Sequence, residues 1–417
     1  MEYFNGDDLA ASVWISKYCM KETDDNGKII YHELTPDDMH HRLAHEFYRA
    51  GLKYNNPLSE QAIYETFKDF KYIVPQGRPM AGIGIDDAVS ISNCFVVGKP
   101  NQDSYGTIAL IDQQIMQISK RGGGVGTDLS RYRPNGSKVH NAAMTSSGPI
   151  DICANRFSNT IREVGQSGRR GALLMSMSIN HPDAERFMDC KMEEGKITGA
   201  NISLKLYDKW ISEALDDNNP DKEKRRLWNK IIHNATAKAE PGVLFWDTIL
   251  RESVADCYKK YGFETTCTNP CGEIPLCPYD SCRLMLLNLY SYVINPYTDE
   301  AHFDYKLFTN HARMVVKLMD NMIDLEMEKI GKIINKIESD PEDNETKEIE
   351  LNLWREIREM CVKGRRSGIG ITGEGDMIAA MGLKYGTAKA TSFATEIQRI
   401  LALNCYIESC DLVQIEG

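Results

Sequence analysis

Between Tyr72 and about Tyr207, short runs of β-branched residues alternate with glycine-rich loops and amphipathic helices. The run Ile91–Val97 is expected to be a buried strand, and a helix is expected from Ser104 to about Lys120. The chain has 417 residues, of which 42% are hydrophobic, so it can bury a sizeable core. That length suits two or three ordinary domains or one large α/β barrel.

The first seventy residues are expected to form a small, mainly helical segment. A turn is predicted at Asp24-Asp25-Asn26-Gly27 between two short strand-like runs, and Thr35-Pro36-Asp37-Asp38 opens a helix with a cap, a first-turn proline and acidic residues. On that helix His41 and His45 lie four residues apart, as metal ligands can. Without a further ligand nearby, we interpret them as exposed helix histidines.

After the strand region, the chain is expected to be largely helical. Pro241-Gly242 interrupts the first helical stretch, and the acidic run 338–350 is interpreted as a solvated face or loop. The expected elements are a helix that begins near His181, a strand over 202–206, helices over 208–258 and 305–328, a strand and loop over 365–373, and a final helix over 388–414.

The chain is acidic, with a formal net charge of −11. This charge argues against non-specific binding to nucleic acid or to an anionic membrane, although a local basic patch could still hold phosphates. The sequence has no run of about 18 apolar residues, and its first residues lack the basic and apolar regions of a signal peptide. We therefore expect a cytoplasmic protein that binds neither nucleic acid nor membrane.

Twelve cysteines occur without regular spacing. In a chain without an export signal this pattern fits reduced thiols better than a disulfide scaffold, so any disulfide would belong to a reaction cycle. A zinc site is conceivable at four cysteines, but their spacing lacks the paired Cys-x-x-Cys knuckles of such sites, and no metal is expected. The four are Cys267, Cys271, Cys277 and Cys282.

Asn269, Cys271 and Glu273 lie at alternating positions in a stretch that is expected to be extended. Alternation places all three side chains on one face. An amide, a thiol and a carboxylate that share one space suit the handling of a polyhydroxylated substrate better than they suit packing. The glycine cluster Gly122–Gly126 would let backbone approach a ligand, but it lacks the lysine and serine of a P-loop and the spacing of a dinucleotide fingerprint.

Several sequence blocks, taken together and in order, resemble the large catalytic subunit of ribonucleotide reductase. The series extends from near the start of the chain to near its end. The blocks are Ser92-Asn93-Cys94, Arg121 to Gly126, Arg133-Pro134-Asn135-Gly136-Ser137, Gln166 to Ala172, His181-Pro182-Asp183, Asn269-Pro270-Cys271-Gly272-Glu273, Ser281-Cys282 with Asn288-Leu289, and Arg366 to Gly370. The segment from Tyr3 to Ala11 and the run from Gly168 to Ala172 most resemble the adenosylcobalamin-dependent class II enzymes.

The resemblance implies a thiyl-radical mechanism that reduces ribonucleotides to 2′-deoxyribonucleotides for DNA precursor synthesis. Cys271 would become the radical that abstracts the 3′ hydrogen of the ribose, because its S–H bond is close in strength to the C–H bond of the activated carbon. Glu273 would take the proton of the 3′-hydroxyl, and Asn269 would hold a ribose hydroxyl. Cys94 and Cys282 match the family's thiol pair, which supplies two electrons while forming a disulfide.

The same resemblance implies two nucleotide sites. At the effector site for a deoxynucleoside triphosphate (dNTP), Asp103 would meet the sugar and Arg133 the phosphates, while the loop that begins at Lys196 would relay effector identity to the substrate. Without the resemblance, a helix cap would explain Asp103 and a surface salt bridge would explain Arg133. The residues that would touch the substrate are Asn93, Gly123, Gly124 and Ser147.

By this resemblance the fold is α/β, an incomplete ten-stranded α/β barrel that comprises the first half-barrel, a finger loop and the start of the second half. We place a mainly helical segment at residues 1–70 and the barrel domain at residues 71–417. The later strands, the loop that grips the substrate diphosphate and the tail cysteines are expected to be absent, as is an ATP-binding regulatory segment. We therefore expect an amino-terminal piece, inactive alone, that needs a complementary C-terminal polypeptide.

The implied cofactor is adenosylcobalamin. The implied partners are a ribonucleoside di- or triphosphate, a dNTP effector, a thioredoxin-like dithiol reductant and further copies of the chain. Two alternatives stay open: a class I large subunit that takes its radical from a separate di-metal subunit, and a catalytically inactive fragment that binds dNTPs in regulation. The five intact residues of the radical and thiol sites argue against an inactive fragment. They are Asn269, Cys271, Glu273, Cys94 and Cys282.

Overall fold

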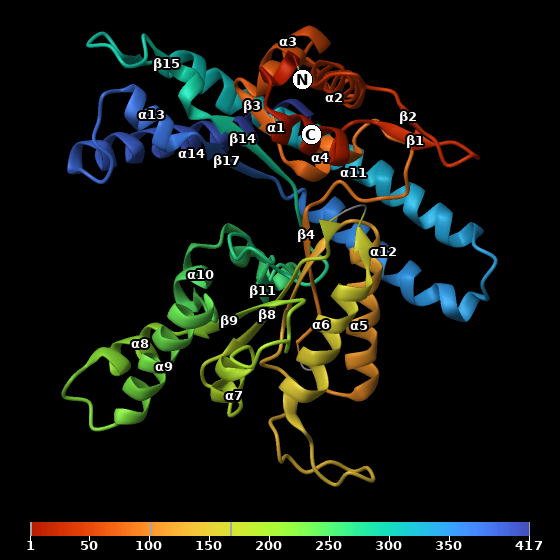
Figure 1. Ribbon diagram of the computed structural model, residues 1–417, viewed down its shortest axis with the longest axis vertical. Helices are drawn as coiled ribbons and strands as arrows, with labels where there is room; N and C mark the ends of the chain where they lie inside the picture. The colour runs from red at the N-terminus through yellow and green to blue at the C-terminus, as the bar shows by residue number, and fades with distance from the viewer. Residues whose placement is uncertain (1, 101, 167–168, 417) are drawn as a thin grey trace. The chain divides into compact units, whose positions relative to one another are not determined.

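The computed structural model describes residues 2–100, 102–166 and 169–416. It divides into two compact units, and Figure 1 follows the chain through both. The first unit comprises Met1–Ser92, Arg283–Ile333 and Cys361–Gly417, and the second comprises Asn93–Cys282 and Ile334–Met360. Within the block from Gln166 to Ala172, Ser167 and Gly168 lie outside the described residues.

A six-stranded sheet with the order β10-β9-β8-β5-β4-β13 forms the centre of the second unit. Neighbouring strands are parallel from β4 to β10, whereas β13 is antiparallel to its neighbour β4. The predicted α/β class is confirmed, and the five parallel strands correspond to the expected first half. The strands are β4 (Cys94–Val97), β5 (Gly124–Asp128), β8 (Leu173–Ser178), β9 (Asn201–Leu206), β10 (Gly242–Phe245) and β13 (Ser281–Cys282).

Helices connect the parallel strands of this sheet, because a parallel pair needs a long crossover connection. Helix α5 begins where the sequence predicts, since the Ser104 hydroxyl accepts a hydrogen bond from the backbone N–H of Thr107 at 3.1 Å. Helices α5 and α6 pack side by side (Figure 1). The connecting helices are α5 (Tyr105–Lys120), α6 (Asn155–Glu163), α7 (Ala184–Asp189), α8 (Asp208–Leu215) and α9 (Lys222–Lys238), and α10 (Trp246–Glu252) follows the last parallel strand.

A short hairpin packs on strand β5 of the sheet. Its strands are β11 (Cys267–Thr268) and β12 (Pro275–Leu276), which pair in antiparallel fashion. Residues 269–274 connect them and correspond to the finger loop expected from the sequence. Below, the segment 266–276, in which the Thr266 N–H also bonds to Leu276, is called the finger hairpin.

The first unit contains a three-stranded sheet with the order β17-β14-β3 and a large apolar core. Strand β14 (Leu284–Asn288) is parallel to β17 (Gly368–Thr372) and antiparallel to β3 (Ile73–Pro75). The mainly helical start of the chain is confirmed. The remaining elements are α1 (Asp8–Lys17), β1 (Lys21–Thr23), β2 (Ile29–Tyr31), α2 (Pro36–Gly51), α3 (Glu60–Phe67), α4 (Gly77–Gly82), β15 (Val293–Ile294), β16 (His302–Phe303), α13 (Glu374–Ala380) and α14 (Ala388–Glu416). No helix among the described residues has the length and apolar character needed to cross a bilayer.

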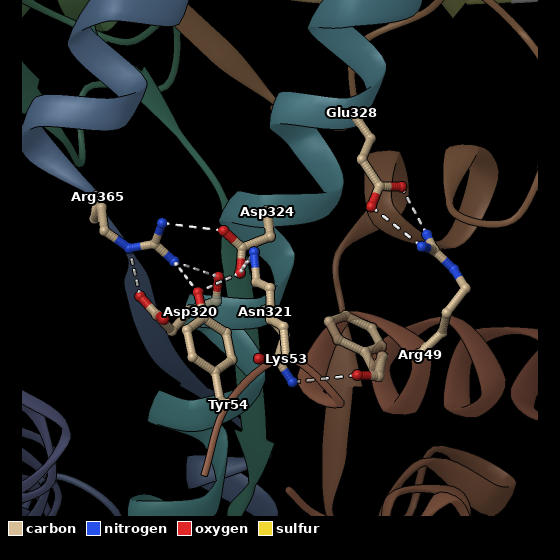
Figure 2. A network of polar contacts seen from close by, with 9 residues as sticks. Arg49, Lys53, Tyr54, Asp320, Asn321, Asp324, Glu328 and Arg365 are labelled. Atoms are coloured by element: carbon tan, nitrogen blue, oxygen red, sulfur yellow. Dashed lines mark hydrogen bonds and ion pairs between the residues drawn. The ribbon is translucent and has the colours of Figure 1, made fainter. Parts of the chain in front are cut away.

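Figure 2 shows a polar network on helix α11 (Tyr305–Ser339). Arg365 donates hydrogen bonds to the carboxylates of Asp320 at 2.8 Å and Asp324 at 3.1 Å. The hydroxyl of Tyr54 donates to Asp324 at 2.6 Å. These bonds tie α11 to the backbone just before β17 and to the segment after α2, and they lower the pKa of Asp324 against the effect of its burial.

Two sequence predictions need correction. The segment after Pro241 is not helical, because Gly242–Phe245 forms the edge strand β10 beside β9. Most of the acidic run 338–350 is exposed, as a solvated face predicts, but the loop alternative is wrong for most of it, since α11 extends to Ser339 and α12 spans Asn344–Gly364. Within that run Glu350 is buried, and its carboxylate accepts hydrogen bonds from Lys120 at 2.8 Å and Arg121 at 3.3 Å.

Candidate active site

Cys94 and Cys282 face each other across the antiparallel strands β4 and β13. Facing residues in such a pair have Cα atoms about 5 Å apart, within the range that a disulfide requires. Both thiols are buried and free. A hydrogen bond with Cys282 raises the pKa of the Cys94 thiol far above its usual value, and burial raises it further. The strand pairing therefore brings these two distant cysteines opposite each other, as the sequence prediction requires.

The first residues of the parallel strands lie side by side in the sheet, and the thiol pair lies at this end of the strands. Cys94 is in register with Gly124, and Val125 with Leu173, so Gly124 lies beside Ala172. A Cβ atom on Gly124 would lie 3.1 Å from Pro270 Cγ and 3.4 Å from Cys94 Sγ. Gly124 thus lies between the thiol pair and the finger hairpin.

The finger hairpin turns sharply, so the predicted extended stretch with three side chains on one face is wrong. The backbone N–H of Gly272 donates to the carbonyl oxygen of Asn269 at 3.0 Å, and Gly272 has a φ of 89°. Asn269 is fully buried, whereas Cys271 and Glu273 are exposed. The three residues therefore lie on a turn and not on a straight strand, so the alternation of strand side chains does not apply to them.

Asn269 joins the finger hairpin to the thiol pair. Its side-chain oxygen accepts a hydrogen bond from the backbone N–H of Ile274 at 2.9 Å, which closes the turn. Its side-chain N–H donates to Cys94 Sγ, with 3.8 Å between nitrogen and sulfur. This donation lowers the pKa of Cys94 against the larger raising effects of Cys282 and burial. Both ends of the amide are thus engaged within the protein.

Cys271 lies at the turn of the finger hairpin. Although the residue is exposed, the pKa of its thiol is raised, first by the partial burial of the thiol group and then by the Glu273 carboxylate and by Cys282. A thiol whose pKa is raised in this way stays protonated at neutral pH. A protonated thiol carries the hydrogen atom that a radical reaction at sulfur exchanges.

The glycines before and within β5 make room for neighbouring groups. The carbonyl oxygen of Thr268 occupies the space that a Cβ atom on Gly126 would need. A Cβ on Gly123 would meet the Phe95 ring at 2.6 Å and Ile118 at 2.7 Å. The space around Gly123 and Gly126 is therefore filled by the protein itself, and Gly124 is the glycine that borders the thiols.

A cavity of about 540 Å³ opens at the start of β8 and β9. Its lining includes Ala172 and Asn201, and the Asn201 side-chain N–H donates to the carbonyl oxygen of Pro270 at 3.3 Å. Arg162 also lines it and has no ion-pair partner among the described residues. The Asn93 side-chain nitrogen is buried and lacks a partner in the described part of the chain. The sequence did not single out Ala172, Asn201 or Arg162 individually, although Ala172 ended a recognised block.

A second pocket, of about 220 Å³, lies at the amino end of α5. Asp103 and Arg133 line it, and Arg133 Nε donates to the Asp103 carboxylate at 2.6 Å. Ser104 caps the helix, so Asp103 is free of that role. Asp103 and Arg133, both predicted for the effector site, therefore meet in one pocket, and Ser104 and Tyr105 at the start of α5 also line it.

The other predicted nucleotide contacts lie apart from these groups. Ser147 is exposed, and its neighbours Ser146 and Gly148 line the pocket at α5. Lys196 is exposed and pairs with Glu193 at 2.5 Å. The loop that follows reaches the cavity at β8 and β9 through Thr198 and Gly199. Their roles remain predictions.

Neither the cysteines nor the helix histidines form a metal site within the described residues. Cys267 instead lies 3.3 Å from the Ser176 hydroxyl, and Cys277 lies 3.7 Å from the Asp280 carboxylate. On α2, His41 stacks on Tyr64. The zinc alternative has no geometric support in this part of the chain.

Comparison with known proteins gives consistent matches. The family model described as "Ribonucleotide reductase, barrel domain" matches residues 92–222 and 204–417. A "Vitamin B12-dependent ribonucleoside-diphosphate reductase" from Mycobacterium tuberculosis is 26% identical over 359 residues, covering 82% of this chain and 46% of that protein. The protein of the same name from Thermoplasma acidophilum is 28% identical over 327 residues, covering 75% of this chain and 38% of that protein. The chain therefore spans less than half the length of these curated relatives.

A solved structure shares the fold. The "Actinobacillus ureae class Id ribonucleotide reductase alpha subunit" superimposes with a TM-score of 0.73 at 18% sequence identity. The superposition covers 98% of this chain and 68% of that chain. At this identity the likeness concerns the arrangement of helices and strands.

Proposed function

Because this chain belongs to the ribonucleotide reductase family, we propose that it carries the radical and dithiol residues for reduction of ribonucleotides to 2′-deoxyribonucleotides. The observation that carries the proposal is the facing pair Cys94 and Cys282 beside the hairpin with Cys271. Substrates are ribonucleoside di- or triphosphates, and the reaction takes place in the cytoplasm.

The dithiol is the electron source. Oxidation of Cys94 and Cys282 to a disulfide releases two electrons and two protons, which reduce the 2′ carbon while its hydroxyl leaves as water. The raised pKa of Cys94 keeps that thiol protonated, so it can deliver a proton to the leaving hydroxyl. An external thioredoxin-like dithiol then regenerates the pair by disulfide exchange.

Cys271 is proposed as the radical residue, with Glu273 as the base for the 3′-hydroxyl proton. Asn269 contributes from the same turn to the surroundings of the sugar. The exposure of Cys271 fits a radical source that must approach its sulfur from outside the sheet. We propose adenosylcobalamin as that source, in keeping with the names of the relatives; it supplies the oxidising equivalent that converts the thiol to a thiyl radical. A separate di-metal subunit is the alternative source.

Substrate would enter the cavity at the start of β8 and β9. There Arg162 offers an anionic group a guanidinium that forms no ion pair within the described residues. Asn93, whose buried side-chain nitrogen is not part of the lining of this cavity, stays a predicted substrate contact. Gly124 lets the sugar approach the thiols, and Gly123, Ser147 and the Lys196 loop are proposed as further nucleotide contacts.

The pocket at α5 is proposed as the effector site for a dNTP. Arg133 would exchange its bond with Asp103 for a phosphate, and the helix start would add N–H donors. Replacing Arg133 with alanine should weaken dNTP binding about tenfold or more. Arg156→Ala, which removes an exposed arginine from α6, should leave dNTP affinity unchanged. Equal affinity for both variants in calorimetric titration would remove Arg133 from the site.

We further propose that activity requires the remaining length of the relatives, supplied by a complementary polypeptide, and that the assembly contains more than one copy of this chain. Residues 1–70 are proposed as a separate helical segment ahead of the barrel domain at 71–417. The purified chain, given adenosylcobalamin and dithiothreitol, should not turn over ribonucleotides. Adding a polypeptide that carries the rest of a B12-dependent relative should give turnover, which Cys271→Ser, Cys94→Ser and Cys282→Ser should each abolish.

The outcomes of that experiment separate the candidates. Turnover by the chain alone would overturn the requirement for a complement. Turnover only with a di-metal subunit would replace adenosylcobalamin as the radical source. The second candidate, a regulatory dNTP-binding fragment, is favoured by the pocket that unites Asp103 and Arg133 independently of the thiols. It would be supported by tight dNTP binding without turnover under every one of these conditions.

A further inference from the structure

Lys205 is a buried lysine beneath the finger hairpin. It belongs to β9, and its side chain is 5% exposed. Its Nζ donates to the carbonyl oxygen of Thr266 at 2.7 Å and pairs with Asp128 Oδ1 at 2.9 Å. The same ammonium lies 3.8 Å from the centre of the Trp246 ring. The contacts of the ammonium group are thus a backbone oxygen, a carboxylate and an aromatic face.

Asp128 extends this contact to the next residue of the hairpin. Its Oδ1 accepts hydrogen bonds from Ser176 at 2.8 Å and from Ser130 at 2.9 Å. The Ser176 hydroxyl lies 3.3 Å from Cys267 Sγ. The two consecutive residues where the hairpin begins, Thr266 and Cys267, are therefore held by side chains from β9 and β8 that share the same carboxylate.

A buried ammonium is costly unless its hydrogen bonds are satisfied, and an apolar side chain of similar size would fill the same space at lower cost. The pair therefore serves something other than packing. The bond to Thr266 is directional, and Thr266 also donates its N–H to Leu276 across the hairpin at 3.0 Å. Lys205 thus fixes the strand pair at the end opposite the turn that carries Cys271.

We propose that Lys205 is a positioning residue that, with Asp128, sets the place of the finger hairpin on the sheet. Gly126 and Gly124 have no side chains that would separate the hairpin from the sheet. Steric contact at these glycines therefore limits only how closely the hairpin can approach the sheet. The charge-assisted bond to Thr266 supplies the attraction that holds it there. The catalytic consequence rests on the proposed function, whereas the structural consequence does not.

The structural consequence is tested by hydrogen exchange in the full chain. In Lys205→Met, the hairpin amides of Thr266, Asn269 and Gly272 should exchange about tenfold faster or more, because one strong hydrogen bond at the base is lost. The amide of Gly124, which bonds to Asn93 at 2.8 Å within the sheet, should keep its exchange rate. Lys209→Met, which removes an exposed lysine from α8, is the matched control and should leave the hairpin unchanged.

A double variant distinguishes a local change in the hairpin from unfolding of the whole chain. Lys205→Met alone leaves the Asp128 carboxylate without its cation, so Asp128→Asn is combined with it to remove both charges. The double variant should unfold at nearly the wild-type temperature and still show the faster hairpin exchange. Wild-type exchange of the hairpin amides in the folded double variant would overturn the proposal.

Activity gives an independent readout. In the enzyme completed with its complementary polypeptide, Lys205→Met should lower kcat about a hundredfold with little change in KM, because a displaced hairpin misplaces Cys271 without altering nucleotide contacts. Lys205→Arg, which keeps the charge and the donors, should recover part of the loss. If the completed wild-type enzyme showed no turnover but the exchange result held, the proposed function would fail, whereas the role of Lys205 as a positioning residue would stand.

Discussion

The carbonyl oxygen of Thr268 fills the space that a Cβ atom on Gly126 would occupy. The finger hairpin therefore crosses β5 in direct backbone contact, at a position where only glycine fits. Within the glycine cluster, Gly126 is explained by the passage of the chain's own backbone over β5, the strand next to β4, which carries Cys94.

Replacing Gly126 with alanine should displace the hairpin. The added methyl group meets backbone, which cannot rotate away, so we expect a loss of about 1–3 kcal/mol in the free energy of unfolding. Faster exchange of the hairpin amides should accompany it. The same substitution at Gly331, a helical position in α11 with open space around it, should be neutral or stabilising by up to about 1 kcal/mol. Equal effects of the two variants in urea titrations would contradict the close approach.

Mild oxidation should convert Cys94 and Cys282 to a disulfide, because the strand register already holds them in range. The raised pKa of Cys94 means that this residue carries little thiolate at neutral pH, so the reaction should be slow near pH 7 and accelerate as the solution becomes alkaline. Peptide mapping by mass spectrometry identifies the bond. Cys94→Ser should abolish it, whereas Cys153→Ser should not, since Cys153 is a buried thiol on a different segment. A bond from Cys271 to either partner as the main product would refute the pairing.

Glu326 should be essential for the stability of the first unit. Its buried carboxylate accepts hydrogen bonds from the Ser90 hydroxyl at 2.5 Å, the Ile91 N–H at 2.8 Å and the Ser92 hydroxyl at 2.9 Å. Glu326→Gln replaces one acceptor oxygen with a donor and should cost about 2–3 kcal/mol.

Glu328, two residues along the same helix, provides the control for Glu326. It forms an exposed ion pair with Arg49 at 2.6 Å, visible in Figure 2. Glu328→Gln should cost no more than about 1 kcal/mol. Thermal unfolding of both variants measures the difference, and a Glu328 effect as large as that of Glu326 would contradict the assignment.

The first unit should lose stability on acidification partly through His40. This side chain is fully buried against Phe70, both ring nitrogens lack partners among the described residues, and burial lowers its pKa to about 4. Between pH values of about 4 and about 6.5, His40 is protonated in the unfolded chain but neutral in the folded protein. The free energy of unfolding therefore falls as the pH falls through this window.

Replacing His40 with leucine tests this contribution. Thermal melting points measured from about pH 7 down to about pH 4 should fall less steeply in His40→Leu than in the wild type. Part of the slope should persist, because burial also lowers the pKa of His311 to about 4. An unchanged slope in His40→Leu would rule the histidine out.

Local sequence signals predicted the secondary structure near the site well. Ser104 marks the start of α5 because capping is a short-range hydrogen bond, and the strand at 202–206 was expected within one residue of β9. Sequence spacing could not predict that Cys94 and Cys282 face each other. Their contact depends on the pairing of β13 with β4, and most of the second unit lies between these two strands in the sequence. Only the resemblance to a family suggested it.

The turn of the finger hairpin shows where alternation misleads. Asn269, Pro270 and Gly272 are turn-forming residues, and reading them as such would have predicted the bend that the structure contains. The burial of Asn269 and its bond to Cys94 had no sequence signal, since the partner lies far away in the chain. Glu350 was misassigned to solvent for the same reason, because Lys120 and Arg121 become its partners only on folding.

The common start of the strands determines where this chain can change in length. Side chains alternate between the two faces of a strand, so one residue inserted within β5 between Gly124 and Gly126 would turn the side chains beyond it to the opposite face. It would also take Gly126 out from under the hairpin. Insertions in the exposed loop at 140–145, beyond the other end of β5, leave the register intact. An insertion near the start of β5 therefore disturbs the contact with the hairpin, whereas an insertion in the loop 140–145 alters the pocket at α5, which His140, Asn141 and Thr145 line.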